Sequence, residues 1–345
     1  MRGLLKSCAV IGAMLSAPLA APVTAQEAVM EFGLPEARQI VLRSTTDIAV
    51  LRPAMELFVR ENPDISVLYE QWGSNDLYFL SQLECADGES RADAVLSSGV
   101  HQMVDLVNAH CATPYSSSLT EALPADLIWR NEVWGVTREA AVIVYNTERV
   151  AEEDVPRSRF GLLDLMRRDT PHTGKIATYD IEASGLGYLF AFSDSLEAST
   201  FGAMLEGFAR VDAVATCCSA TIIEGVSSGR YHMAYNVLGS YAGTVGLDNL
   251  AIVRPEDYTL YLSRAFLIPR TAPSKPEAGR LLDFFLSAQG RAALEKIGLW
   301  DEGSGEVSAS RGIGIDPTLL IALDQQRRTR FISQWRATFG PKASP

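Results

Sequence analysis

Short apolar segments alternate with amphipathic ones along the first third of the chain, and each apolar segment ends in a small polar turn. Their periodicity predicts strands over 40–42, 65–72 and 92–96, and helices over 48–58, 77–83 and 100–107. Strands that alternate with helices in this way form a parallel, doubly wound sheet. The sequence therefore predicts an α/β domain whose three polar turns lie along one edge of its sheet.

A long apolar run over 134–146 predicts a β segment that crosses into a second domain. There the pattern predicts strands over 176–179 and 231–235, and helices over 160–166, 186–190, 198–210 and 220–228. An apolar segment over 261–269 would return to the first domain, and helices are expected over 277–297 and 317–339. We therefore assign 26–145 to the first part of lobe 1, 146–260 to lobe 2, and 261–345 to the return to lobe 1 and the C-terminal helices. Residues 26–38 are expected to form a flexible start.

The first 25 residues have the three parts of a secretory signal peptide. Arg2 and Lys6 make a positive start, an apolar run extends over 8–19, and the small residues at 23–25 form a cleavage site before Gln26. The apolar run is too short for a transmembrane helix. We therefore expect an exported, periplasmic protein.

The overall charge limits the possible partners. The formal net charge is −12 with 47% hydrophobic and 21% charged residues, which is typical of a globular chain with an acidic surface. Nucleic-acid binding needs a basic surface, so we expect no nucleic-acid partner. The sign of a small ligand stays open, because a site can differ locally from the whole surface.

The four cysteines after the signal peptide are Cys85, Cys111, Cys217 and Cys218. Cys85 and Cys111 each end a predicted helix of the same lobe, and an oxidising compartment favours a disulfide between them. Cys217 and Cys218 are adjacent, a spacing that rarely closes on itself. Neither pair has the spacing of a zinc or redox motif.

The polar turns supply the candidate binding residues. Their hydroxyls, backbone N–H groups and helix N-termini suit an anion or an oxygen-rich ligand, although helix capping alone would also explain them. Arg138, in the crossing segment, is the candidate cation for a phosphate or carboxylate. The other candidates are Ser44, Thr45, Thr46, Ser74, Asn75, Ser97 and Ser98 in lobe 1, and Ser184, Gly185, Asn236, Gly239, Ser240 and Tyr241 in lobe 2.

Motifs for catalysis or cofactors are weak. Residues 225–229 match G-x-S-x-G around Ser227, but that motif needs a strand before the serine and a helix after it, and the predicted order is reversed. The histidines lack metal-ligand spacing, and no phosphate-binding loop occurs. We therefore expect no enzyme activity, no cofactor and no metal; an exported hydrolase using Ser227 is an alternative.

Four further segments carry a family resemblance: VLRSTTD (41–47), WGVTREAAVIVYNT (134–147), GRYHMAYNVLGSYA (229–242) and FFLSAQGRAALEKIG (284–298). With the signal peptide, they resemble the periplasmic solute-binding proteins of ABC importers, in the type II branch that holds ferric-iron and phosphorylated-solute receptors. The resemblance implies two doubly wound lobes joined by a β hinge that close on a ligand. It also implies a monomer whose partner is an ABC permease of the inner membrane or, alternatively, a sensor kinase.

The ligand implied by this resemblance depends on the turn after Asn236. The ferric receptors hold iron with two adjacent tyrosines just after that asparagine. Here Val237 and Leu238 follow it, and Tyr235 and Tyr241 lie on either side of the turn. We therefore expect a small anionic organic solute, phosphorylated or carboxylated, with ferric iron as the alternative.

Overall fold

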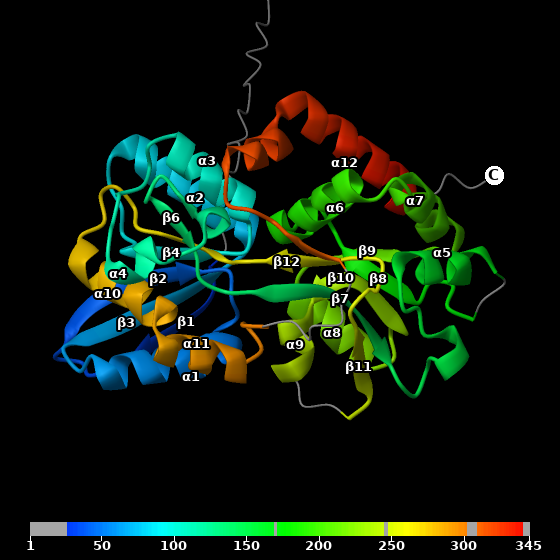
Figure 1. Cartoon of the computed structure of the whole chain (residues 1–345), viewed down its shortest axis with the longest axis horizontal. Coiled ribbons are helices and arrows are strands. Elements are labelled where there is room, and N and C mark those ends of the chain that lie inside the picture. The colour runs from blue at the N-terminus through cyan, green and yellow to red at the C-terminus, as the bar shows by residue number, and fades with distance from the viewer. Residues whose placement is uncertain (1–25, 169–170, 245–247, 302–308, 341–345) are drawn as a thin grey trace, which may run out of the picture.

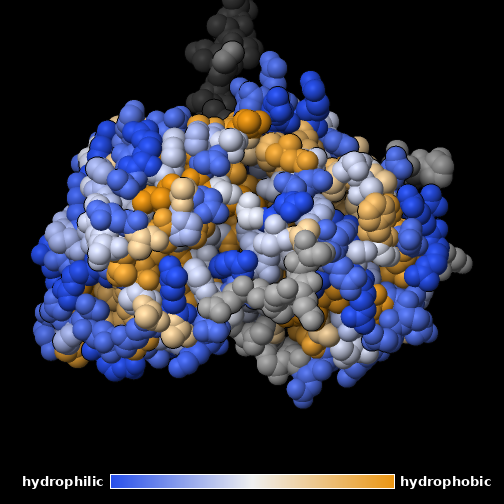
Figure 2. Space-filling view, viewed as in Figure 1, coloured by the Kyte–Doolittle hydropathy of each residue, from blue (hydrophilic) through white to orange (hydrophobic). Residues whose placement is uncertain are grey.

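Two lobes lie side by side in the computed structural model, each built on one sheet with helices on its faces (Figure 1). Hydrophilic residues predominate on the face of the molecule that Figure 2 shows. The structure describes residues 26–168, 171–244, 248–301 and 309–340. The predicted signal peptide, 1–25, lies outside these residues. Within the described ranges, no helix combines the length and the apolar character needed to cross a membrane. The predicted α/β class with two lobes is confirmed.

The sheet of the first lobe has the strand order β1-β3-β2-β4-β13-β6-β5. β2 is parallel to both β3 and β4, so the turns that follow these strands share one edge, as the sequence pattern predicts. Its strands are β1 (Gln26–Phe32), β2 (Arg38–Ser44), β3 (Ile65–Trp72), β4 (Ala94–Ser97), β5 (Ile128–Trp129), β6 (Val133–Gly135) and β13 (Ala265–Leu267). Its helices are α1 (Ile48–Glu61), α2 (Ser74–Asp87), α3 (Val100–Asn108), α4 (Ser118–Glu121), η1 (Ala125–Leu127), α10 (Lys275–Leu286) and α11 (Ala288–Lys296).

The expectation that residues 26–38 form a flexible start is wrong for Gln26–Phe32, which form β1. β1 is an edge strand that runs antiparallel to β3, with Gln26 opposite Trp72 and Ala28 opposite Gln71. Local periodicity did not show it, because most of its side chains are exposed and its hydrogen bonds go to a strand distant in sequence. This pairing brings Glu27 to the edge where the polar turns lie.

The second lobe has the strand order β14-β12-β7-β10-β8-β9, and β11 also pairs with β7. Its strands are β7 (Glu139–Asn146), β8 (Ile176–Tyr179), β9 (Val214–Thr216), β10 (Met233–Leu238), β11 (Leu250–Val253), β12 (Thr259–Leu262) and β14 (Ser310–Gly312). Its helices are η2 (Glu152–Asp154), α5 (Arg159–Arg167), α6 (Gly185–Glu197), α7 (Phe201–Arg210), α8 (Ser219–Ser227), α9 (Gly239–Thr244) and α12 (Gln325–Phe339).

The sequence pattern predicted a strand that ends before Asn236, but the strand continues through this residue. The register between β10 and β7 shifts between Ala234 and Val237, and Asn236 takes a left-handed φ of 59° inside this irregularity. Asparagine tolerates that conformation better than most residues. The strand then continues to Leu238, and Gly239 begins α9.

Two β segments join the lobes. The predicted run over 134–146 divides into β6 in the first sheet and β7 in the second. The segment over 261–269 returns in the opposite direction, with β12 in the second sheet and β13 in the first. Hydrogen bonds hold the two crossings together, since the amide of Val136 donates to the carbonyl of Arg264 (3.0 Å). These paired crossings form the connection about which two lobes can rotate.

The predicted C-terminal helices are each interrupted. The helix expected over 277–297 breaks at Ser287, whose extended backbone and hydroxyl cap α11. The helix expected over 317–339 becomes η3 (Pro317–Leu323) and α12, separated by Asp324. η3 packs on α3 of the first lobe and α12 on α7 of the second, so this end of the chain contacts both lobes (Figure 1).

Candidate functional site

A cavity of about 60 Å³ lies where the edge of the first lobe faces the second. The turns after β2, β3 and β4 approach it from one side, and the starts of α6, α8 and α9 from the other. Ligands of open α/β sheets bind at this place, outside the carboxyl ends of the strands. The lining residues are Glu27, Thr45, Asp47, Trp72, Gly73, Ser74, Ser98, Tyr179, Ala183, Ser184, Leu186, Cys217, Cys218, Ser219, Tyr241 and Arg264.

Hydroxyl groups form the wall of the first lobe. Oγ1 of Thr45 accepts a hydrogen bond from the amide of Ser98 (2.9 Å) and lies 3.1 Å from the Ser98 hydroxyl. This contact ties the turn after β2 to the turn after β4. The wall is therefore fixed by its own hydrogen bonds before any ligand arrives.

The second lobe contributes a serine cap and a buried tyrosine. The Ser184 hydroxyl accepts from the amide of Gly187 and so caps α6 (3.0 Å). The Tyr179 hydroxyl lies 2.6 Å from that of Ser219 and accepts from the amide of Leu238 (3.4 Å). Burial raises the pKa of Tyr179 to about 12, so this phenol stays protonated near neutral pH.

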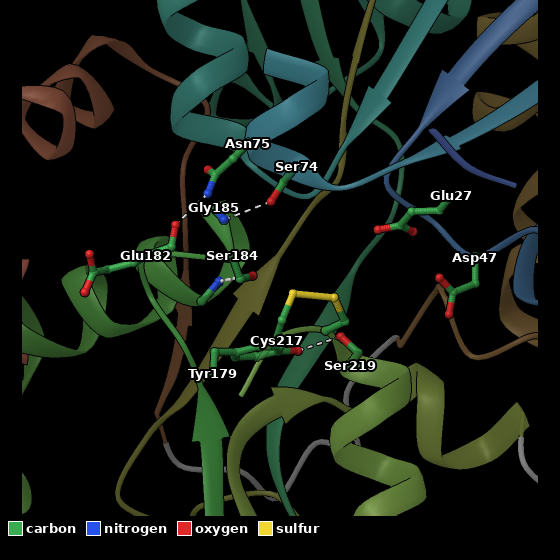
Figure 3. The surroundings of a disulfide bond; sticks show 12 residues. Glu27, Asp47, Ser74, Asn75, Tyr179, Glu182, Ser184, Gly185, Cys217 and Ser219 are labelled. Atoms are coloured by element: carbon green, nitrogen blue, oxygen red, sulfur yellow. Dashed lines mark hydrogen bonds between the residues drawn. A yellow bond between two sulfur atoms is a disulfide. The ribbon is translucent and has the colours of Figure 1, made fainter. Parts of the chain in front are cut away.

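Within the described residues, hydrogen bonds join the lobes directly at this place. The amide of Gly185 donates to the Ser74 hydroxyl (2.8 Å), and Nδ2 of Asn75 donates to the carbonyl of Glu182 (2.9 Å), as Figure 3 shows. The amide of Asp47 donates to the hydroxyl of Tyr241 (3.4 Å). The lobes are therefore closed on one another around the cavity.

Two carboxylates face this cavity from the first lobe, Glu27 and Asp47 (Figure 3). Nε2 of Gln71 donates to both of them, at 2.9 Å each, so the two acidic groups share one amide. Asp47 occupies the N-cap position of α1, yet its side chain makes no capping hydrogen bond. Burial raises the pKa of Asp47; the Arg264 charge opposes that shift, and the Glu27 charge adds to it.

Arg264 lines the cavity, but its charge is matched inside the protein. Its guanidinium donates to both carboxylate oxygens of Glu139, at 2.7 and 3.1 Å, and its third nitrogen donates to the Thr46 hydroxyl (2.9 Å). The Ser240 hydroxyl also donates to Glu139 (2.7 Å). This network joins the two crossing segments to both lobes.

The disulfides differ in part from the expectation. Cys85 and Cys111 are joined, as predicted. Cys217 and Cys218 are also joined, so the expectation that this adjacent pair stays open is wrong (Figure 3). Cys218 has a φ of 71° and lies at the N-terminus of α8. This left-handed backbone conformation is rare for a residue other than glycine, and no sequence pattern predicted it.

The candidate residues from the sequence fall into three groups. Those that line the cavity are Thr45, Ser74, Ser98, Ser184 and Tyr241. Those that hold its walls or join the lobes by hydrogen bonds are Ser44, Thr46, Asn75, Ser97, Gly185 and Ser240. Asn236 and Gly239 border other hollows, and so does Ser240.

The position of Arg138 differs from the one expected for the candidate cation. Its guanidinium lies over the ring of Tyr261, 4.0 Å from the ring centre, and donates to the carbonyl of Asp301. It does not line the cavity between the lobes. Strand neighbours point to opposite faces, so sequence position alone could not tell that this side chain turns away while Glu139 turns in.

Sequence reasoning missed Glu27, Asp47 and Arg264 as lining residues, and Trp72 and Tyr179 also line the cavity. An available signal was Asp47 itself, which ends the same polar turn as Thr45. Glu27 could not be found because its strand was not predicted. Arg264 had no local signal, since its partner Glu139 lies 125 positions away.

The remaining motifs do not form a site. Ser227 is the last residue of α8 and β10 follows it, so the order required for a G-x-S-x-G nucleophile is reversed. Among the residues that the structure describes, no three His, Cys, Asp or Glu side chains come together to hold a metal ion.

Comparisons with known proteins agree with this architecture. Residues 91–302 match the family described as bacterial extracellular solute-binding protein. The substrate-binding protein of an ABC transporter from Agrobacterium tumefaciens is 30% identical, with a TM-score of 0.84 over 92% of this chain and 99% of that one. No curated protein matches the chain.

More distant structures share the fold. Iron-bound HitA from Pseudomonas aeruginosa is 18% identical, with a TM-score of 0.64 over 84% of this chain and 99% of that one. AfuA from Actinobacillus pleuropneumoniae, with fructose-6-phosphate bound, is 17% identical, with a TM-score of 0.67 over 88% of this chain and 99% of that one. With the family match and the 30% identical relative, the chain belongs to the bacterial extracellular solute-binding proteins, the substrate-binding components of ABC transporters.

Proposed function

We propose that this chain captures a small solute in the periplasm, in the cavity between its lobes, and delivers it to an ABC permease of the inner membrane. The observation that carries the proposal is the lining of one cavity by residues of both lobes, such as Thr45 and Ser98 from one and Ser184 and Tyr241 from the other. A sensor kinase is the alternative partner.

Closure, rather than chemistry, would be the working step. The hydrogen bonds from Gly185 to Ser74 and from Asn75 to Glu182 exist only when the lobes meet. A solute that contacts both walls binds the closed state better than the open state and therefore shifts the population toward it. The permease would then distinguish the loaded receptor from the empty one by its shape.

The anionic class of solute expected from the sequence is not favoured by this cavity. Arg138, the candidate cation for such a solute, lies elsewhere, over Tyr261. The positive group that does line the cavity, Arg264, is already paired with Glu139. An anion would also meet the carboxylates of Glu27 and Asp47, and this repulsion would weaken its binding.

Ferric iron is a second candidate because the cavity presents oxygen atoms of Glu27, Asp47 and Tyr241. Iron favours anionic oxygen ligands. A tyrosine ligand would have to lose its proton, and burial raises the pKa of Tyr241 well above its ordinary value. An iron-loaded sample would show a visible tyrosinate-to-iron absorption band, and a colourless sample after loading would exclude this candidate.

Native mass spectrometry of protein purified without denaturation tests the proposed function. The wild-type chain should carry a small molecule that is lost on unfolding. Thr45→Trp fills the cavity and should remove that molecule, whereas Thr113→Trp, outside the cavity lining, should retain it. Equal amounts of bound molecule in the two folded variants would contradict binding at this place.

A further inference from the structure

We propose that the cavity between the lobes selects a small organic cation that carries an ammonium or guanidinium group. The inference rests on the proposed function and names the class of solute for the same site. It differs from the anion expected from the sequence and from the sugar phosphate and iron that distant structures hold.

The first step is the negative charge on the wall of the first lobe, where neither Glu27 nor Asp47 forms an ion pair within the described residues. Glu27 and Asp47 share the neutral amide of Gln71, which supplies hydrogen bonds but no positive charge. Within the described residues, the second oxygen of each carboxylate accepts no hydrogen bond from the protein. An ammonium or guanidinium group has several N–H donors and can serve both oxygens together.

The second step is that the nearby arginines are already neutralised. Arg264 holds both oxygens of Glu139. Arg43, on β2 behind the same edge, is paired with Glu70 and Glu84, at 2.8 Å in each case. Both guanidinium groups are therefore held by other carboxylates. The Arg264 charge offsets that of Asp47 only in part, and a bound cation would add to this effect.

The third step is the shape and chemistry of the other walls. Trp72, Tyr179 and Tyr241 line the cavity, and aromatic rings attract organic cations through their π faces. The Arg43 guanidinium already lies over the Trp72 ring, 5.9 Å from its centre, so this contact would come from the two tyrosines. The cavity volume of about 60 Å³ favours a compact solute.

The Asp47 carboxyl supplies an independent readout. Burial raises its pKa, the Arg264 charge opposes this rise, and the Glu27 charge adds to it. A bound cation would lower that pKa again, because an opposite charge favours the ionised form. Binding should therefore release protons and weaken as the pH falls through the pKa of Asp47.

Titration calorimetry on the protein, freed of any co-purified molecule by unfolding and refolding, tests the inference. The cationic probes are methylammonium, guanidinium and 1,4-diaminobutane; the other probes are inorganic phosphate, citrate and ferric citrate. We expect at least one cation to bind saturably and no anion to do so. Asp47→Asn and Glu27→Gln should each weaken the cation at least tenfold, and Glu31→Gln, an exposed acid on the same strand, should change it less than twofold.

Several outcomes would overturn the inference. If phosphate or citrate binds and no cation does, the inference is wrong but the proposed function stands. The same conclusion follows if only iron binds. Unchanged cation affinity in both carboxylate variants, with their folding checked by thermal melting, would place the cation elsewhere. If no probe binds while native protein still carries a molecule at the cavity, the solute class is wrong and the receptor function is retained.

Discussion

Arg264 holds both carboxylate oxygens of Glu139 at the point where the two crossing segments meet, and both side chains are almost fully buried. Glu139 begins the crossing strand of the second sheet, and Arg264 immediately precedes the strand that returns to the first. The Thr137 hydroxyl donates to the same carboxylate (2.9 Å). The connection between the lobes is therefore organised around one ion pair that water does not reach.

Removing one partner should destabilise the protein strongly, because it leaves the other charge buried and unpaired. We expect Glu139→Gln or Arg264→Met to cost about 3–5 kcal/mol in the free energy of unfolding. Urea unfolding measures this cost. The exposed pair of Arg280 and Asp64 supplies the control, since Asp64→Asn should change stability little. Equal losses in both pairs would show that burial is not the cause.

Closure can be blocked at Gly185, whose amide contacts Ser74 of the other lobe. A Cβ added there would lie 2.7 Å from Nε2 of Gln102, a side chain of the opposite lobe. Gly185→Ala should therefore weaken solute binding severalfold, and Gln102→Ala in the same chain should restore part of it. Gly202→Ala, with no neighbour within 4 Å, is the matched control. A thermal-shift titration with the native solute measures all four proteins, and failure of Gln102→Ala to restore binding would contradict this account.

His101 should make the protein sensitive to acid. Burial lowers its pKa to about 3 and Arg328 adds to the shift, while its ring stacks on Tyr188 of the other lobe. Below the ordinary histidine pKa of about 6.5 the unfolded chain binds a proton that the folded chain refuses, so stability falls as the pH falls from about 6.5 toward 3. Above about pH 6.5 the imidazole is neutral in both states, so His101 no longer lowers the stability.

The melting midpoint of wild type and His101→Gln between pH 7.5 and pH 5 measures this effect, since roughly those values bracket the ordinary pKa of the imidazole. We expect a smaller drop in the variant, because glutamine does not titrate. Parallel curves would exclude His101 as the origin.

The two disulfides should differ in their effect on stability. The Cys85–Cys111 bond closes a loop with a sequence separation of 26, and its loss should cost about 3.5 kcal/mol through the entropy of the unfolded chain. The bond between Cys217 and Cys218 closes almost no loop, so its removal should cost far less by this route. Serine pairs at each position, compared by urea unfolding, test the contrast; a larger loss at the adjacent pair would be inconsistent with it.

Much of the fold follows from local periodicity because its strands and helices are regular and amphipathic. The sequence predicted that the turns with Thr45, Ser74 and Ser98 share one edge, because parallel strands have their carboxyl ends on the same side of a sheet. The second lobe was found in the same way, and Ser184 lies where its turn predicts.

The charges of the site could not be predicted in this way. Glu27 reaches the cavity through an edge strand whose partner lies far along the chain, and Arg264 is neutralised by a residue of another segment. Arg138 differs from Glu139 by one position, which reverses the face of a strand. Electrostatic complementarity depends on these long-range contacts, and so the expectation of an anionic ligand could not take the carboxylates of Glu27 and Asp47 into account.

The distance between the lobes, measured by electron spin resonance with labels at Gln82→Cys on α2 and Leu196→Cys on α6, tests the central claim most directly. Both positions are exposed, one on each lobe. We predict one short distance when the native solute is bound, and a longer, broader distribution after its removal or in Thr45→Trp. The same distribution with and without the solute would contradict closure around it.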